Sequence, residues 1–363
     1  MYQAFRPLLF QLDAEQAHSA GVSAAKVGQA TSPSLLKAMY GYQHSALEQR
    51  LFGLRFRNPV CVAAGFDKNA ELMSFWDAIG CGYVEVGSVS ARPSDGNPKP
   101  RAFRLPADEA LINRMGLNNV GAEVAAGRLA RANVSIPVGV NIAKTHDPAI
   151  LGQAGIEDFA DSFRKLAPFA GYMAINVSCP NTEEGKTFED PEALHALLSR
   201  LYSEREAVAP RVPMLVKLSP PAGEDVDGPA LDALLAVTEA HEVDGYIATN
   251  TASDRKGLST SLVRLNEIGR GGLSGKPLRE RSTQLVRALW RRVGARVPVI
   301  GVGGIDSADA AYEKVLAGAS LLQLYTGLVY QGPGLIKTIN RGLVRRLHAD
   351  GFESIENAVG ARA

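Results

Sequence analysis

The sequence is poor in several features that mark whole classes of protein, and each absence narrows the choice. It has three cysteines, Cys61, Cys81 and Cys179. An odd number of widely spaced cysteines argues against a disulfide framework. No apolar run reaches the roughly 18 residues that a membrane-spanning helix needs. The start lacks the basic stretch, apolar segment and cleavage site of a secretory signal. We therefore expect a protein of the reducing, cytoplasmic side of the cell.

An excess of charge of one sign is also missing. The chain has 39 Lys and Arg against 38 Asp and Glu, which gives a formal net charge of +1. Such a balance provides no global field to attract nucleic acid, so we expect no nucleic-acid partner. Apolar residues make up 46% of the 363 positions, enough for the core of one large domain or two medium ones.

From Pro59 onward, short β-rich apolar runs alternate with helical patterns. We predict eight strands, at residues 60–64, 83–86, 138–142, 172–177, 214–218, 245–249, 297–301 and 321–325. A helix follows each strand, near residues 69–79, 120–132, 157–167, 191–207, 228–241, 277–293, 307–317 and 334–348. This alternation implies parallel strands joined by crossover helices, and eight such units predict an α/β (β/α)8 TIM barrel. A doubly wound open sheet is the alternative, because the repeat alone does not show closure.

Residues 1–45 differ from the rest, and we predict that they form a small N-terminal helical extension to a barrel of residues 46–363. Phe5, Leu8 and Leu9 recur at helical spacing. Asp13 is a candidate N-cap for a second helix that reaches about residue 28, and a third begins near Ser32. Residues 51–58 are predicted to form a hairpin that closes the barrel floor. The long loops are predicted at 88–119, 181–190 and 252–275.

The most informative stretch, residues 174–182, reads Ala-Ile-Asn-Val-Ser-Cys-Pro-Asn-Thr. It begins as a buried strand and ends in reactive side chains, as the strands of barrel enzymes do. The amides of Asn176 and Asn181 can hold a flat, amide-rich ring, and Cys179 between them can move a proton. The alternative is an ordinary strand end with a buried cysteine and turn-forming asparagines.

Two lysines stand at other strand ends. Lys217 lies in an apolar strand, where a lone ammonium would be costly, so we favour a cation beside a flavin or a Schiff-base amine. Lys68 follows the first strand and can bind a carboxylate, although a solvated lysine in a tight turn gives the same pattern. Glycine-rich turns follow the last two strands, at 301–304 and around Gly327, and residues 271–275 are predicted as a third. Such turns cradle phosphate groups in barrels of this type.

In these motifs the chain resembles the dihydroorotate dehydrogenase family, in its membrane-associated, quinone-dependent class. The matching segments are Ala-Ala-Gly-Phe-Asp-Lys (63–68), Asn-Arg-Met-Gly (113–116), Ile-Asn-Val-Ser-Cys-Pro-Asn-Thr (175–182), Val-Lys-Leu (216–218), Ala-Thr-Asn-Thr (248–251), Gly-Gly-Leu-Ser-Gly (271–275) and Ile-Gly-Val-Gly-Gly-Ile (300–305). The resemblance covers nearly the whole chain, in order. It implies oxidation of (S)-dihydroorotate to orotate in de novo pyrimidine (UMP) biosynthesis, with a hydride passing to FMN and the electrons then to a quinone.

The resemblance also implies the site residues. Cys179 falls at the position of the catalytic base, and Lys217 would stabilise negative charge on the flavin. FMN is expected at Ala64, Gly65, Phe66, Asp67, Lys68, Ser88, Asn141, Asn176, Lys217, Thr249, Gly275, Gly304, Tyr325 and Thr326. Substrate is expected at Lys68, Asn113, Arg114, Met115, Gly116, Leu117, Asn176, Asn181, Asn250 and Thr251. No metal is expected.

The opening residues 10–18, Phe-Gln-Leu-Asp-Ala-Glu-Gln-Ala-His, look like the extension that marks the quinone class. That extension would form a quinone tunnel, with His18 and Arg104 as polar contacts, and would rest on the cytoplasmic face of the cell membrane, most naturally a bacterial inner membrane. One residue departs from the pattern. The quinone class typically carries Ser at the base position and the soluble classes carry Cys, whereas this chain combines Cys179 with the extension.

Other classes of function remain as alternatives. A soluble-class dihydroorotate dehydrogenase would pass its electrons to fumarate or another acceptor. A barrel lyase would use Lys217 as a Schiff-base amine. A tRNA dihydrouridine synthase would need a basic face and an RNA-binding domain, which the charge balance argues against. A non-catalytic module on the membrane surface would not need the amide-rich strand ends.

Overall fold

The computed structural model describes residues 2–178, 187–220 and 226–363. Eight strands form its main sheet, in the order β3-β13-β12-β10-β9-β8-β7-β4, and all the pairings within it are parallel. The strands are β3 (Val60–Val62), β4 (Val84–Val89), β7 (Val138–Ile142), β8 (Tyr172–Asn176), β9 (Met214–Leu218), β10 (Gly245–Ala248), β12 (Val299–Val302) and β13 (Ala319–Leu324). Each lies within or beside a segment predicted to be a strand.

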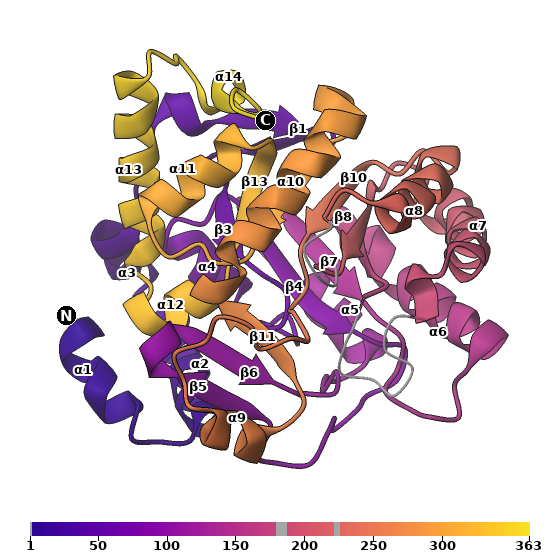
Figure 1. Ribbon diagram of the computed structural model, residues 1–363, viewed down its shortest axis with the longest axis horizontal. Coiled ribbons are helices and arrows are strands. Elements are labelled where there is room, and N and C mark those ends of the chain that lie inside the picture. Colours follow the sequence, from indigo (N-terminus) through magenta and orange to yellow (C-terminus); the bar gives the residue numbers. More distant parts are fainter. Residues whose placement is uncertain (1, 179–186, 221–225) are drawn as a thin grey trace.

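The ring closes between β3 and β4, because Gly82 N–H donates to Val60 O at 2.9 Å and Gly65 N–H donates to Gly87 O at 2.5 Å. The predicted TIM barrel is therefore confirmed over the open sheet. Its outer helices occur where the sequence predicts them (Figure 1). They are α4 (Met73–Ala78), α5 (Ala122–Leu129), α6 (Gly152–Leu166), α7 (Pro191–Val208), α8 (Pro229–Ala240), α10 (Arg279–Val293), α11 (Ala308–Leu316) and α13 (Leu335–Ala349).

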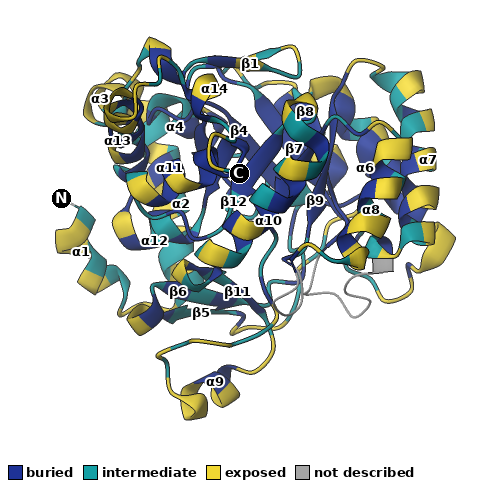
Figure 2. Cartoon of the chain, turned by 45° about the horizontal axis from the view of Figure 1, so that its top comes forward, coloured by how far each residue is buried: buried dark blue, intermediate teal, exposed yellow. Residues whose placement is uncertain are grey.

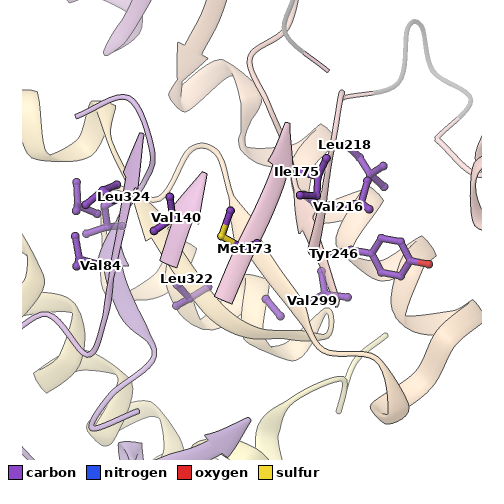
Figure 3. Close-up of a cluster of buried hydrophobic side chains, with 14 of the residues drawn as sticks. Val84, Val140, Met173, Ile175, Val216, Leu218, Tyr246, Val299, Leu322 and Leu324 are labelled. Carbon is purple, nitrogen blue, oxygen red and sulfur yellow. The ribbon is translucent and has the colours of Figure 1, made fainter. Parts of the chain in front are cut away.

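Strand residues alternate between two cores, because successive side chains on a strand point to opposite faces of the sheet. The outward core lies between the strands and the helices, and Figure 3 shows part of it, including Val84, Met173 and Leu322. The inward core fills the lower barrel with Tyr83, Tyr172 and other fully buried side chains. Figure 2 shows this pattern across the molecule, with buried strands inside and helices exposed on their outer faces.

A hairpin closes the barrel floor, as predicted. Its strands β1 (Gln49–Leu51) and β2 (Leu54–Phe56) pair antiparallel. Phe56 is fully buried against the inward core, and its ring meets Tyr83 edge to face at 5.3 Å. The hairpin therefore closes one end of the barrel, and the carboxyl ends of the strands lie at the other.

Three helices precede the barrel: α1 (Tyr2–Leu9), α2 (Ala14–Thr31) and α3 (Pro33–Tyr40). The carboxylate of Asp13 accepts from the N–H groups of Glu15 and Gln16, which confirms the predicted N-cap. A buried ion pair ties α2 to the barrel side, because Arg101 Nη2 lies 2.7 Å from a Glu15 carboxylate oxygen. Phe5, Leu8 and Leu12 remain exposed. Among the described residues no helix is long and apolar enough to cross a membrane.

The long loops contain structure that the sequence did not reveal. Strands β5 (Ala102–Leu105), β6 (Ala110–Asn113) and β11 (Gly272–Gly275) form an antiparallel sheet beside the barrel mouth, near α9 (Leu262–Ile268) (Figure 1). The prediction of a glycine-rich turn at residues 271–275 is wrong. That segment is β11, paired with β6 from Gly272↔Asn113 to Gly275↔Ala110. A partner about 160 residues away decides its conformation, so local composition was misleading.

The remaining elements are short. Helix α12 (Thr326–Gln331) follows β13, and α14 (Ile355–Ala358) lies near the C-terminus. The 3-10 helices are Ser45–Leu47, Pro106–Asp108, Ala167–Phe169, Thr187–Glu189, Lys276–Leu278 and Gly294–Arg296.

Candidate functional site

A cavity occupies the mouth of the barrel, between the carboxyl ends of the strands and the antiparallel sheet. Side chains and backbone from most of the strand ends line it. The predicted site residues on its wall are Ala64, Gly65, Lys68, Ser88, Asn113, Met115, Gly116, Leu117, Asn176, Lys217, Thr249, Asn250, Thr251, Gly275, Gly304, Tyr325 and Thr326. Residues scattered over 260 positions are thus brought together, as the barrel topology requires. Cys179 and Asn181 lie outside the described residues.

An array of amides and hydroxyls crosses the bottom of this cavity. Ser88 Oγ donates to Asn141 Oδ1 at 2.5 Å, and Asn176 Nδ2 donates to Ser88 Oγ at 3.0 Å. Asn250 Nδ2 donates in turn to Asn176 Oδ1 at 3.2 Å. Asn141 is fully buried and does not line the cavity, so its effect on a ligand passes through Ser88. The array fixes several amides around one flat space.

Lys217 points into the barrel from β9 and is 6% exposed. It lines the cavity beside Asn176, which is its partner in the β8–β9 register. Ser178 Oγ donates to the Lys217 carbonyl at 2.9 Å and so holds the two strand ends together. A buried ammonium in this place favours a ligand group that carries or develops negative charge.

Glycine backbone forms the opposite wall. Gly303 and Gly304 have φ values of +116° and +68°, which L side chains rarely adopt. Gly304 also has no room for a side chain, since an added Cβ would lie 2.7 Å from Arg279 N. Arg279 Nε donates to Gly304 O at 3.0 Å, and its guanidinium pairs with Asp306. This wall suits the close approach of a phosphate-bearing ligand to backbone.

The predicted substrate loop forms the roof. Asn97 holds it, because Asn97 N–H donates to Met115 O at 3.1 Å and Asn97 Nδ2 donates to Arg114 O at 2.9 Å. The Arg114 side chain does not line the cavity. Its guanidinium donates to Ile268 O at 2.5 Å and packs over the Phe103 ring at 4.7 Å.

Lys68 and Asp67, in the segment after β3, have different roles. Lys68 lines the cavity and donates from Nζ to Asn118 Oδ1 at 2.7 Å. Burial, helped by the charge of Arg101, lowers the pKa of Lys68 to about 8. The Asp67 carboxylate instead accepts from Glu71 N–H and Leu72 N–H, both at 2.8 Å, and burial raises its pKa. Asp67 therefore shapes the turn.

A second, more apolar cavity lies between the N-terminal helices and the barrel. Phe66 and Tyr325 stand in its wall with ring centroids 5.3 Å apart. His18 packs on Phe66 at 4.9 Å, and burial lowers its pKa to about 4, so its imidazole is neutral at neutral pH. Arg104 lies over the Phe10 ring at 4.7 Å and donates to Leu9 O and Leu12 O.

The two cavities share a wall. Its residues, which line both spaces, are Lys68, Ala102, Leu111, Met115 and Tyr325. The predicted quinone contacts His18 and Arg104 both lie in the second cavity. A ligand there would be separated from the mouth of the barrel by one layer of side chains.

Sequence reasoning missed two residues of this site. Gln323 lines the mouth from β13, and Glu85 lies fully buried on β4 beneath the amide array. Each is an inward-facing polar residue inside an apolar strand, which is the signal that could have revealed them.

The residues fit a flat cofactor that carries a phosphate. Six buried side-chain polar atoms have no hydrogen-bond partner among the described residues, and two of them are Thr251 Oγ1 and Gln323 Oε1. Both belong to residues of the mouth, and buried polar atoms ordinarily have partners, so a ligand group is the natural complement. With the amide array, the Lys217 cation and the glycine wall, fold and site define a cofactor-dependent (β/α)8-barrel enzyme.

Comparison with known proteins makes this class specific. The family model of dihydroorotate dehydrogenase matches residues 46–347. The dihydroorotate dehydrogenase (quinone) of Gloeobacter violaceus is 42% identical over 99% of this chain and 98% of its own length. That of Natronomonas pharaonis is 44% identical over 99% of both chains. A ligand-free DHODH crystal structure from Eimeria tenella superposes with a TM-score of 0.81 at 30% identity, covering 92% of this chain and 98% of that one.

The chain belongs to the dihydroorotate dehydrogenase family. This membership confirms the resemblance drawn from the sequence and the class of flavin-dependent oxidoreductase that it implied. It also decides against the Schiff-base lyase and the tRNA-modifying barrel. The full-length relatives carry the quinone designation, in agreement with the class predicted from residues 10–18.

Proposed function

We propose that this protein oxidises (S)-dihydroorotate to orotate at the barrel mouth, with FMN as cofactor and a quinone as the final electron acceptor. The observation that carries the proposal is the pair of cavities that share a wall at Tyr325 and Lys68. One cavity offers amides for a polar ring, and the other offers an apolar slot for a lipid-soluble acceptor. The reaction would serve de novo pyrimidine biosynthesis.

FMN would be held by the glycine wall, Lys217 and the array of Ser88, Asn141 and Asn176. When bound, it supplies the acceptor for the substrate hydride and relays two electrons onward. The remaining proposed contacts are Ala64, Gly65, Phe66, Asp67, Lys68, Thr249, Gly275, Gly304, Tyr325 and Thr326. The phosphate would lie against Gly303 and Gly304, where backbone conformation and space admit only glycine.

The substrate would lie between Asn113, Leu117 and the Asn176–Asn250 pair. The amides present both donors and acceptors, as the imide and amide groups of a pyrimidine ring require. Lys68 would pair with the substrate carboxylate, because it is a buried cation already oriented by Asn118. Asn181, Thr251 and the backbone at Arg114–Gly116 complete the proposed contacts.

Two residues would carry the chemistry. Cys179 would accept the proton from the ring carbon next to the one that loses hydride, since it follows Ser178 at the end of β8. Lys217 would stabilise negative charge that develops at the cofactor edge. No separate acid is needed, because the carbon–carbon double bond of orotate forms as the proton and the hydride leave.

Residues 1–45 would act as a separate unit that forms the quinone slot on the barrel of residues 46–363. His18 and Arg104 would contact the quinone carbonyls. The exposed Phe5, Leu8 and Leu12 would rest on the cytoplasmic face of the cell membrane as a peripheral contact. Such a position brings a lipid-dissolved quinone to the slot without any spanning helix.

An anaerobic flavin spectrum in two steps tests the proposal. Dihydroorotate is added first and should bleach the flavin absorbance, and a short-chain ubiquinone added next should restore it. Bleaching without recovery would support the dehydrogenase activity but not the quinone. The electron acceptor would then be fumarate or a protein, as in the soluble classes. A flavin that dihydroorotate does not bleach would refute the proposal.

The base assignment has its own test. A thiol is more acidic than a hydroxyl, so activity with Cys179 should persist to lower pH than in a Cys179→Ser variant. The measurement is the pH dependence of kcat for flavin reduction in both proteins. Superimposable pH profiles would contradict the role of Cys179 as base.

A further inference from the structure

A carboxylate lies directly beneath the amide array and takes no part in the proposed chemistry. Glu85 is fully buried, and it projects inward from β4 above the apolar barrel floor. Asn141 Nδ2 donates to its Oε1 at 3.0 Å. Tyr172 O–H and Gln323 Nε2 donate to its Oε2, at 2.8 and 2.7 Å. All three hydrogen bonds that the Glu85 side chain makes with the described residues are thus donated to it, and an ionised carboxylate can only accept.

This arrangement fixes the orientation of Asn141. Turned over, the Asn141 amide would place its oxygen against a carboxylate oxygen at about the same 3.0 Å separation, where two acceptors repel. The Asn141 oxygen must therefore face Ser88. A hydroxyl has one proton, and Ser88 uses it on Asn141 Oδ1, so Ser88 can only accept from the next group.

The orientation of Ser88 then restricts the amides that follow it along the mouth of the barrel. Because Ser88 accepts, Asn176 must present its Nδ2 to Ser88, and its oxygen faces the other way. There it accepts from Asn250 Nδ2, which leaves the Asn250 oxygen to accept from Thr251 N–H at 2.9 Å. Every donor in the chain points toward Glu85. Glu85 thereby fixes Asn141 and Ser88 at one end of the chain, while the Ser178 carbonyl fixes Asn250 at the other, because it accepts from Asn250 Nδ2 at 2.8 Å.

We propose that Glu85 is a positioning residue, which fixes Asn141 and Ser88 so that Ser88 accepts from Asn176, and the hydrogen-bond chain keeps one direction up to the end that the Ser178 carbonyl fixes. The inference rests on the proposed function, because it assigns Asn176 and Asn250 to the ring that they recognise. Glu85 itself touches neither ligand, and it acts through Asn141 and Ser88.

The first test compares two variants, each of which nearly keeps the size of the residue that it replaces. Glu85→Gln can turn either its oxygen or its nitrogen toward Asn141, so the amide array loses its single direction. We expect the affinity of the oxidised flavoprotein for orotate, measured by the shift of the flavin absorbance, to fall about tenfold. FMN affinity of the apoprotein should fall as well. The matched control is Tyr172→Phe, which removes one donor from the same carboxylate and leaves the chain direction intact, so orotate affinity should not change.

A Glu85→Gln protein that binds orotate and FMN as the wild type does would overturn the proposal. So would an equal loss in Tyr172→Phe, which would point to core packing alone.

A measurement on the wild type avoids any risk that a variant fails to fold. Neutron diffraction from deuterated crystals locates the deuterium atoms, which should lie on Asn141 Nδ2 toward Glu85 and on Ser88 Oγ toward Asn141. The opposite orientation of Asn141 would overturn the inference. Titrations of the wild type with FMN and orotate separate a failure of the Glu85 inference from a failure of the proposed function. If the wild type binds neither FMN nor orotate, the function fails; if only the variants behave unexpectedly, the role of Glu85 fails.

Discussion

Lys314 on α11 is a buried ammonium whose replacement should change the pH dependence of folding. It is fully buried, and its Nζ donates to Ser282 Oγ at 2.6 Å and Thr283 Oγ1 at 2.9 Å. Burial lowers its pKa from 10.5 to about 7, Glu313 opposes that shift, and Arg279 adds to it. Its space exists because position 301 is glycine, where an added Cβ would lie 2.5 Å from Lys314 Cδ.

The direction in which folding stability changes with pH follows from proton linkage. Since the folded pKa of Lys314 is below the unfolded value of 10.5, the unfolded chain binds more protons between pH 7 and 10.5. The penalty is fully present below pH 7 and disappears as pH rises through 10.5. Each pKa unit is worth about 1.4 kcal/mol, so the two pKa values imply a penalty of about 4 kcal/mol at pH 7 and about 2 kcal/mol at pH 9.

Lys314→Met shortens the side chain by one heavy atom, the amine nitrogen, and so removes the titrating group. Ser282 and Thr283 keep partners, because both hydroxyls also donate to Arg279 O. We expect the variant to be more stable than the wild type at pH 7. The difference between the two proteins should shrink by about 2 kcal/mol between pH 7 and pH 9.

The assay is urea denaturation of both proteins at pH 7, 8 and 9 with saturating FMN. Lys256→Met, at an exposed position, is the control and should keep the wild-type slope of stability against pH. A Lys314→Met difference that does not vary with pH would refute the reasoning. Such a result would mean that the buried amine stays protonated from pH 7 to pH 9. Groups other than Ser282 and Thr283 would then have to solvate its charge.

Three further predictions follow from other parts of the molecule. Gly139→Ala should destabilise the barrel by about 2 kcal/mol, because the new Cβ would lie 2.0 Å from the Tyr172 ring. Gly127→Ala should not lower the melting temperature, because its new Cβ would meet only Arg131 Nη2, at 3.9 Å. Glu15→Gln should cost about 1.5 kcal/mol, because it removes the charged partner of the buried Arg101, which keeps its hydrogen bond to Asn97 O; unchanged thermal stability would contradict this. Deletion of residues 2–45 should abolish quinone reduction while dihydroorotate still bleaches the flavin, whereas loss of both half-reactions would indicate a structural role for the extension.

Much of the barrel could be predicted because its signals are local. Runs of β-rich residues such as 214–218 match a strand to the residue, and Asp13 caps α2 as its position before an amphipathic pattern suggested. The strand ends also revealed Lys217 and Asn176, since barrels place their chemistry there. The quinone class was evident from residues 10–18, and the full-length relatives agree with it.

Other features depend on pairs of segments that the sequence does not connect. Residues 271–275 look like a turn by composition, yet they form β11 because β6 offers an edge about 160 positions earlier. The direction of the Asn141 amide depends on Glu85, which the sequence presents only as one polar residue in an apolar strand.

The sequence by itself determined the eight repeats, the helical extension and the residue types at the strand ends. These follow from periodicity and local propensity, which act over a few positions. Only the tertiary structure decided that Arg114 faces α9 and not the cavity, that Asp67 shapes a turn, and that Tyr325 separates two cavities. Those outcomes depend on hydrogen bonds and packing between distant segments, and no local pattern encodes which partner a polar side chain will meet.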